Sequence, residues 1–203
     1  METQIKDILC ELCNVGIGSG MAALSHIIDR EVNYSIPDAD GLKAYSMIAD
    51  PYLKAENYVA GVSLPFDGDI EGMILIIYKP SMVRVILEQT YGSAPGWKDI
   101  GGELLDMVRE TANIMASTYL TALSTYTKWN LNAGRSAVTM DMAGSMIGEA
   151  AGMVAYEDQD VLCIASRFGL ETEEKENCML MMIKEHSIPG FLETLGGERC
   201  AGL

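Results

Sequence analysis

A stretch of nineteen residues occurs twice in this chain, and the second copy repeats the polar residues of the first. Residues 106–124 read DMVRETANIMASTYLTALS, and residues 7–25 read DILCELCNVGIGSGMAALS. At an offset of 99 residues, six positions are identical, namely Asp7 and Asp106, Glu11 and Glu110, Asn14 and Asn113, Ala23 and Ala122, Leu24 and Leu123, and Ser25 and Ser124. The shared polar pattern is Asp-x-x-x-Glu-x-x-Asn. We therefore expect an internal duplication, with one repeat over about residues 1–99 and the other over about residues 100–203.

The spacing of this pattern places its polar side chains together if each stretch is a helix. Positions i, i+4 and i+7 fall on one stripe of a helix with 3.6 residues per turn. A carboxylate only accepts hydrogen bonds, whereas an Asn amide both donates and accepts, so the stripe can bind a cation of a partner and position a water. The alternative is an ordinary solvated helix face. Recurrence of Asn in mid-helix, where Asn is not favoured, argues against that alternative.

The other faces of both stretches are apolar and are expected to pack on a sheet. They carry Ile8, Leu9, Leu12 and Val15 in the first copy and Leu105, Met107, Val108 and Ile114 in the second. The first stretch continues into a glycine-rich run at residues 16–20, GIGSG. Glycines destabilise a helix by about 1 kcal/mol each, so close approach of a neighbouring backbone is the expected reason for them. A phosphate-binding loop is the alternative, but no strand precedes the run and no Lys follows it at the required place.

Patterns along the rest of the chain predict a similar order of elements in each half. Long helices are expected over residues 1–30 and 101–127. Hairpins are expected from residues 58–65 with 72–78, where Asp67 and Gly68 form the turn, and from residues 161–168 with 178–184, which an acidic turn joins. The remaining predictions are a loop and short helix over 37–49, a helix over 80–91, a loop or short strand over 132–139, and helices over 140–153 and 189–195.

These elements predict one α/β domain of the α+β kind over residues 1–203. Its two long helices are expected to pack on a mainly antiparallel sheet, and the two halves are expected to be related by pseudo-two-fold symmetry. Such symmetry would place the two polar stripes at separate, equivalent positions on the surface. The expectation is therefore two sites and not one composite site.

Composition and charge exclude several kinds of partner. The formal net charge is −15, which argues against nucleic acid and anionic membranes because both need a basic surface. The most apolar run, residues 73–78, is too short to cross a bilayer, and no signal peptide is recognisable. Five cysteines without a framework spacing are typical of a reducing compartment. A cytoplasmic protein that neither binds nucleic acid nor inserts into membranes is expected.

Other residues that carry chemistry elsewhere are expected to be structural here. Cys10 and Cys13 have the C-x-x-C spacing of zinc and thiol-redox sites. A zinc site would need two further ligands, and a redox motif would follow a strand and not lie within a helix. His26 and His186 have no Ser or Cys at motif spacing, so a nucleophilic triad is unsupported.

Two segments of the second half, NIMASTYLTALS at 113–124 and AVTMDMAGSMIG at 137–148, resemble CheC, the family of bacterial chemotaxis phosphatases. ELCNVGIGSGMAALSHIIDREV, from residue 11, is similar to the family's N-terminal Glu-x-x-Asn helix. The resemblance covers nearly the whole chain, and the duplicated Asp-x-x-x-Glu-x-x-Asn is its most specific element. It implies a CheC-like fold and a phosphatase that acts on the phosphoaspartate of the response regulator CheY.

The resemblance also implies a role for each motif residue. Glu11 and Glu110 would pair with a lysine of the regulator, and Asn14 and Asn113 would orient the attacking water. Asp7 and Asp106 occupy the leading acidic or serine position and would be supporting residues. No cofactor of the chain's own is expected, because the Mg²⁺ would be supplied by the bound regulator. The receptor deamidase CheD is a second partner that the family implies.

Three departures from the family pattern lie in the first copy. Ser19 and Gly20 stand where Asn and Ala are more frequent, and Cys13 stands where Gly or Ala is usual. The second site is therefore expected to match the family better. The alternative function is a non-enzymatic adaptor that binds CheD, or an interaction module like those of the flagellar switch. Switch proteins with a related middle domain carry an additional C-terminal domain, which is not expected here because the sequence stops at Leu203.

Overall fold

The computed structural model describes residues 2–35, 54–155, 161–170 and 176–187, with the backbone alone for residues 2–10 and 185. Its helices in these ranges are α1 (Glu2–Ile28), α2 (Pro80–Thr90), α3 (Glu103–Thr127) and α4 (Ala143–Val154). Its strands there are β1 (Val32–Tyr34), β2 (Tyr58–Gly68), β3 (Gly72–Tyr78), β4 (Leu131–Ala133), β5 (Ala137–Met142), β6 (Val161–Leu170) and β7 (Asn177–Lys184). The helices predicted over 37–49 and 189–195, and most of the acidic turn after residue 170, lie outside the described residues.

The described strands form one antiparallel sheet in the order β1-β6-β7-β3-β2-β4, and β5 pairs with β2 along the same edge as β4. Its central ladder joins β3 to β7, from Gly72 opposite Ile183 to Ile77 opposite Cys178. Strands from the two halves of the chain therefore meet in the middle of a single sheet. The predicted α+β class with a mainly antiparallel sheet is confirmed.

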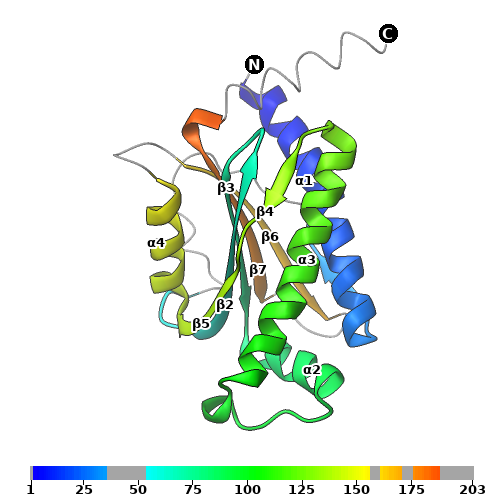
Figure 1. Ribbon diagram of the computed structural model, residues 1–203, viewed down its shortest axis with the longest axis vertical. Coiled ribbons are helices and arrows are strands. Elements are labelled where there is room, and N and C mark those ends of the chain that lie inside the picture. The colour runs from blue at the N-terminus through cyan, green and yellow to red at the C-terminus, as the bar shows by residue number, and fades with distance from the viewer. Residues whose placement is uncertain (1, 36–53, 156–160, 171–175, 188–203) are drawn as a thin grey trace.

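Strand β3 shows why this sheet must be covered on both faces. All of its residues are buried, and successive side chains of a strand point to opposite faces. One face contributes Ile74, Ile76 and Tyr78 to the core beneath α1, α2 and α3, and the other contributes Met73, Leu75 and Ile77 to the core beneath α4. Figure 1 shows α1 and α3 side by side on one face and α4 on the opposite face. The long helices thus pack on the sheet as predicted, and α4 adds a third layer.

Glycines of α1 allow this helix to lie close to α3. A Cβ added to Gly16 would lie 2.7 Å from the ring atom Cε2 of Tyr119, and one added to Gly20 would lie 3.2 Å from the carbonyl oxygen of Met115. These contacts run in opposite directions along the two helices, which are antiparallel (Figure 1). Close approach of a neighbouring backbone is confirmed at Gly20, whereas the neighbour at Gly16 is an aromatic ring.

Both halves of the chain occupy corresponding places in this arrangement. The sheet order reads the same from both ends when β1 is matched with β4, β6 with β2 and β7 with β3. An offset of 99 residues separates Gly16 from Met115 and Gly20 from Tyr119, so it exchanges the two interhelical contacts with each other. The same offset separates β1 from β4. This symmetry supports the duplication, which stays a prediction.

Two boundaries differ from the expectation. Residues 140–142 were expected to begin a helix, but they end β5, where Met140 lies opposite Ala60 and Met142 opposite Tyr58. Asp67 and Gly68 were expected to form the hairpin turn, but they are the last residues of β2 and pair with β4. In both places, pairing with a strand distant in sequence extends a strand beyond its local signal.

A polar cluster links the end of β7 to the residue just before β3 through hydrogen bonds and an ion pair. The Glu71 carboxylate lies 2.7 Å from Lys184 Nζ, and the backbone N–H of Glu71 donates to Ser187 Oγ at 3.1 Å. The hydrogen bond and charge of Lys184 lower the pKa of Glu71 from its ordinary value of 4.5. A carboxyl group whose pKa is depressed by folding stabilises the protein above its unfolded pKa and loses this effect as the pH falls.

Glu71→Gln is therefore expected to lower the melting temperature at pH 7, by about 2 °C or less because the carboxylate is partly exposed. The difference from wild type should shrink as the pH falls below 4.5, where the carboxylate of the wild type becomes protonated. Thermal unfolding at pH 7, 5, 4 and 3 measures this. A difference that stays constant over this range would show that the ion pair does not contribute to stability.

Candidate functional site

The first copy of the motif lies on the exposed side of α1. Glu11 and Asn14 are exposed, while Leu12 and Cys13 between them are 3% and 2% exposed. A helix that buries one face on α3 and the sheet turns these two polar positions towards solvent together. Asp7 belongs to the same helix, but its side chain lies outside the described part of the chain.

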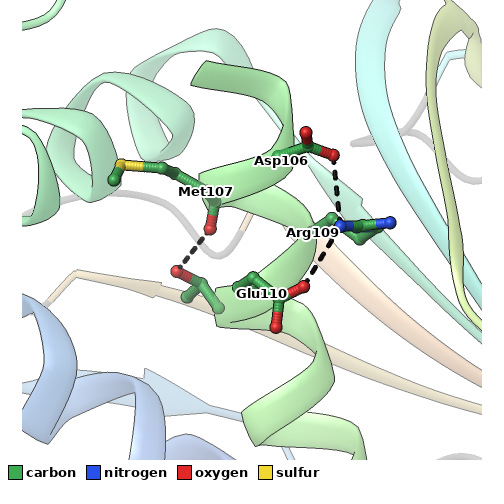
Figure 2. A network of polar contacts seen from close by, with 5 residues as sticks. Asp106, Met107, Arg109 and Glu110 are labelled. Carbon is green, nitrogen blue, oxygen red and sulfur yellow. Dashed lines mark hydrogen bonds and ion pairs between the residues drawn. The ribbon is translucent and has the colours of Figure 1, made fainter. Parts of the chain in front are cut away.

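The second copy lies on α3 and contains an ion-pair network. Asp106 and Glu110 are exposed, and Asn113 is half-buried. Figure 2 shows the Arg109 side chain between the two carboxylates, where its Nη2 lies 3.2 Å from Asp106 Oδ1 and 3.2 Å from Glu110 Oε1. Arg109 is not among the candidate residues predicted from the sequence. Its spacing of three residues from Asp106 on a predicted helix was the available signal.

The structure brings Glu11 near Asn14 and Glu110 near Asn113, but it does not bring the two pairs together. Each motif lies in the first half of its helix, and α1 and α3 are antiparallel, so the motifs lie towards opposite ends of the helix pair (Figure 1). Neither pair is sealed within the core. The arrangement therefore offers two separate surfaces, each with an acid and an amide.

An exposed aliphatic side chain follows the Asn of each motif. Val15 is 42% exposed and Ile114 is 49% exposed, and the two are 99 residues apart. Both were assigned to packing faces by their hydrophobicity, and this assignment is wrong. Isolated exposed aliphatics are common on protein surfaces, but these two occupy matching positions beside matching polar residues. Each candidate surface thus combines a carboxylate, an amide and a small apolar area.

Other candidate chemistry receives no support from the described residues. Within them, no group of His, Cys, Asp and Glu side chains is arranged to hold a metal ion. Cys13 is buried beside Tyr119, whose pKa is raised mainly by burial and further by this thiol. The Cys10 side chain lies outside the described residues, so the C-x-x-C pair is described only in part. None of the described helices is both long and apolar enough to cross a membrane.

Comparison with known proteins identifies a relative by sequence. No family model matches the chain. The CheY-P phosphatase CheC of Bacillus subtilis (strain 168) is 29% identical over 147 residues, which cover 70% of this chain and 69% of that protein. The resemblance to the CheC family is confirmed.

Solved structures of chemotaxis proteins share the CheC-like fold. FliY of Thermotoga maritima superposes with a TM-score of 0.69 at 17% identity, over 96% of both chains. CheX in the CheX-CheY-BeF3-Mg²⁺ complex of Borrelia burgdorferi superposes with a TM-score of 0.53 at 15% identity, over 84% of this chain and 95% of that one. These structural likenesses concern the fold, whereas the relation to CheC rests on sequence.

Proposed function

We propose that this CheC-like chain is a phosphatase that hydrolyses the phosphoaspartate of a CheY-type response regulator. The observation that carries the proposal is the presence of two Glu-x-x-Asn pairs on separate surfaces of one domain, in which both glutamates and Asn14 are exposed and Asn113 is half-buried. The sequence relation to a CheY-P phosphatase supports it, as does the shared fold with a protein that was crystallised in complex with CheY. A response regulator of this class would meet the chain in the cytoplasm.

Each motif residue has a separate role in this proposal. Glu11 or Glu110 binds a lysine of the regulator and thereby fixes the orientation of the two proteins. Asn14 or Asn113 then reaches the phosphoryl group and holds a water in line with the bond that breaks. Asp7 and Asp106 support the motifs on their helices, and the neighbouring Val15 or Ile114 contributes apolar contact to the regulator.

Hydrolysis transfers the phosphoryl group from the regulator's aspartate to water. The water oxygen forms a new P–O bond, the bond to the aspartyl oxygen breaks, and inorganic phosphate and a free carboxylate result. The Mg²⁺ would belong to the regulator and would neutralise charge on the phosphoryl oxygens. Phosphoryl transfer depends mainly on positioning and electrostatic stabilisation, so an amide that orders the water can account for acceleration without a nucleophile on this chain.

The direct test measures phosphate release from a CheY-type regulator that has been phosphorylated with a small phosphodonor in the presence of Mg²⁺. The purified chain is expected to accelerate release at substoichiometric concentration, because it is not consumed. A regulator whose phosphorylated aspartate is replaced by asparagine provides the control. Release that proceeds at the regulator's own rate with an equimolar amount of chain would contradict the proposal.

A second candidate function is that of an adaptor or switch-like interaction module. The side chain of Met153 is 65% exposed and lies near the end of α4, the helix that covers the sheet face away from α1 and α3 (Figure 1). A second partner bound there would leave both motifs open, and CheD is the partner that the resemblance implies. Capture of purified CheD by a chain that does not accelerate phosphate release would favour the adaptor.

A further inference from the structure

The ion-pair network on α3 contains a cationic residue that the sequence of the first motif does not repeat. Arg109 lies on the same stripe as Asp106, Glu110 and Asn113, and only 28% of its side chain is exposed. Its Nη2 atom is shared between the two carboxylates at 3.2 Å each (Figure 2). The equivalent residue of the first copy, 99 positions earlier, is Cys10, which has no cation to offer.

Two atoms of this stripe are buried without a hydrogen-bond partner. Among the side chains that the structure describes, these atoms are Arg109 Nε and Asn113 Oδ1. The first is a donor and the second an acceptor, and their residues are one helical turn apart, at i and i+4, where side chains on one helix face are neighbours. Buried polar groups in folded proteins are almost always paired, so two complementary unpaired atoms at this spacing are each other's natural partners.

We propose that Arg109 is a positioning residue of the second site, which holds Glu110 through Nη2 and Asn113 through Nε. This inference rests on the proposed function and adds the residue that orients its amide. With Oδ1 held by Arg109, the amide Nδ2 of Asn113 faces outward, towards the phosphoryl group and its attacking water.

This pairing makes the two sites unequal. An amide that is fixed before the partner arrives loses less conformational freedom on binding than one that is free to rotate. Asn14 is exposed on α1 and has no guanidinium on its own stripe at the position of Cys10. The second site is therefore the faster of the two, and the contribution of Arg109 appears mainly in kcat.

Kinetics of variants that work through the second site alone test the proposal. In an Asn14→Ala background, Arg109→Met is expected to lower kcat for phosphate release by about 10-fold, with a smaller change in KM. Arg109→Lys should restore only part of the loss, because an ammonium can pair with a carboxylate but has no Nε–H directed at the amide. Arg84→Met in the same background is the matched control. It removes an exposed arginine from another helical ion pair, that with Glu88, and should leave the rate unchanged.

A second readout is independent of the regulator. In NMR spectra of the free chain, the Arg109 Nε–H is expected to show a nuclear Overhauser contact with the side-chain amide protons of Asn113. Arg109→Met should shift the Asn113 amide signals and leave those of Asn14 in place. Absence of the contact, or an unchanged Asn113 signal in the variant, would overturn the pairing.

The outcomes separate the inference from the proposed function. If the wild-type chain does not accelerate phosphate release, the proposed function fails, and NMR alone decides whether Arg109 holds Asn113. If the chain is active and Arg109→Met has less than a two-fold effect, the positioning role is overturned. A rate that increases in Arg109→Met would also overturn it, because Arg109 would then compete with the regulator's lysine for Glu110.

Discussion

Phosphate release accelerated by the chain is expected to fall by about 100-fold or more when Asn14 and Asn113 are both replaced by alanine. Alanine removes the amide that orders the water and leaves the glutamates that bind the regulator. Binding of the regulator should therefore persist while the chemical step is lost. A stopped-flow or coupled phosphate assay measures the rate, and fluorescence anisotropy of a labelled regulator measures binding.

The single variants and a control variant show whether the loss of activity in the double variant comes from the two motif amides. Asn14→Ala and Asn113→Ala should each retain part of the activity, since the two surfaces are separate. Asn130→Ala replaces an exposed asparagine outside both motifs and should retain full activity. The double variant is expected to fold normally, because Asn14 is exposed and Asn113 is half-buried, so neither side chain belongs to the buried core. A fully active, folded double variant would refute the assignment of the amides.

Gly16→Leu is expected to lower the free energy of unfolding by about 3 kcal/mol, because it inserts a side chain into a closely packed interface. The Cβ alone would lie 2.7 Å from the Tyr119 ring, which is 3% exposed and whose hydroxyl donates to Met181 Sδ at 3.2 Å. The ring cannot move aside without losing that contact. For a chain of this length, the melting temperature should fall by about 6–12 °C.

The same substitution at Gly148 provides the matched control. Gly148 lies on the exposed side of α4, and nothing approaches within 4 Å of an added Cβ there. Gly148→Leu should be neutral or stabilising by up to about 1 kcal/mol, since leucine favours helix over glycine. Urea or thermal unfolding measures the stability of both variants relative to wild type. Equal melting temperatures for the two would show that the interface between α1 and α3 is more tolerant than its geometry indicates.

Local patterns were enough to predict the elements on which the candidate site depends. The long helices, the hairpins and the buried strand β3 have periodicities set by residues near in sequence, so they could be predicted without coordinates. The exposed stripe of Glu11 and Asn14 also follows from spacing alone, because a helix fixes which of its residues share a face.

Boundaries and neighbours that depend on distant residues could not be predicted in this way. Residues 140–142 are strand because they pair with β2, about 80 positions earlier in the chain. Val15 and Ile114 have apolar side chains, yet the packing of α1 against α3 leaves them on the surface.

The sequence by itself determined that the chain carries two helical stripes of acid and amide on a duplicated pattern, because helical spacing is a local property. Tertiary structure decided that these stripes lie on separate surfaces and that an exposed aliphatic side chain accompanies each. These properties depend on the antiparallel packing of α1 and α3 and on which side chains that packing covers. Contacts between residues distant in sequence decide how the two helices pack and which side chains are covered.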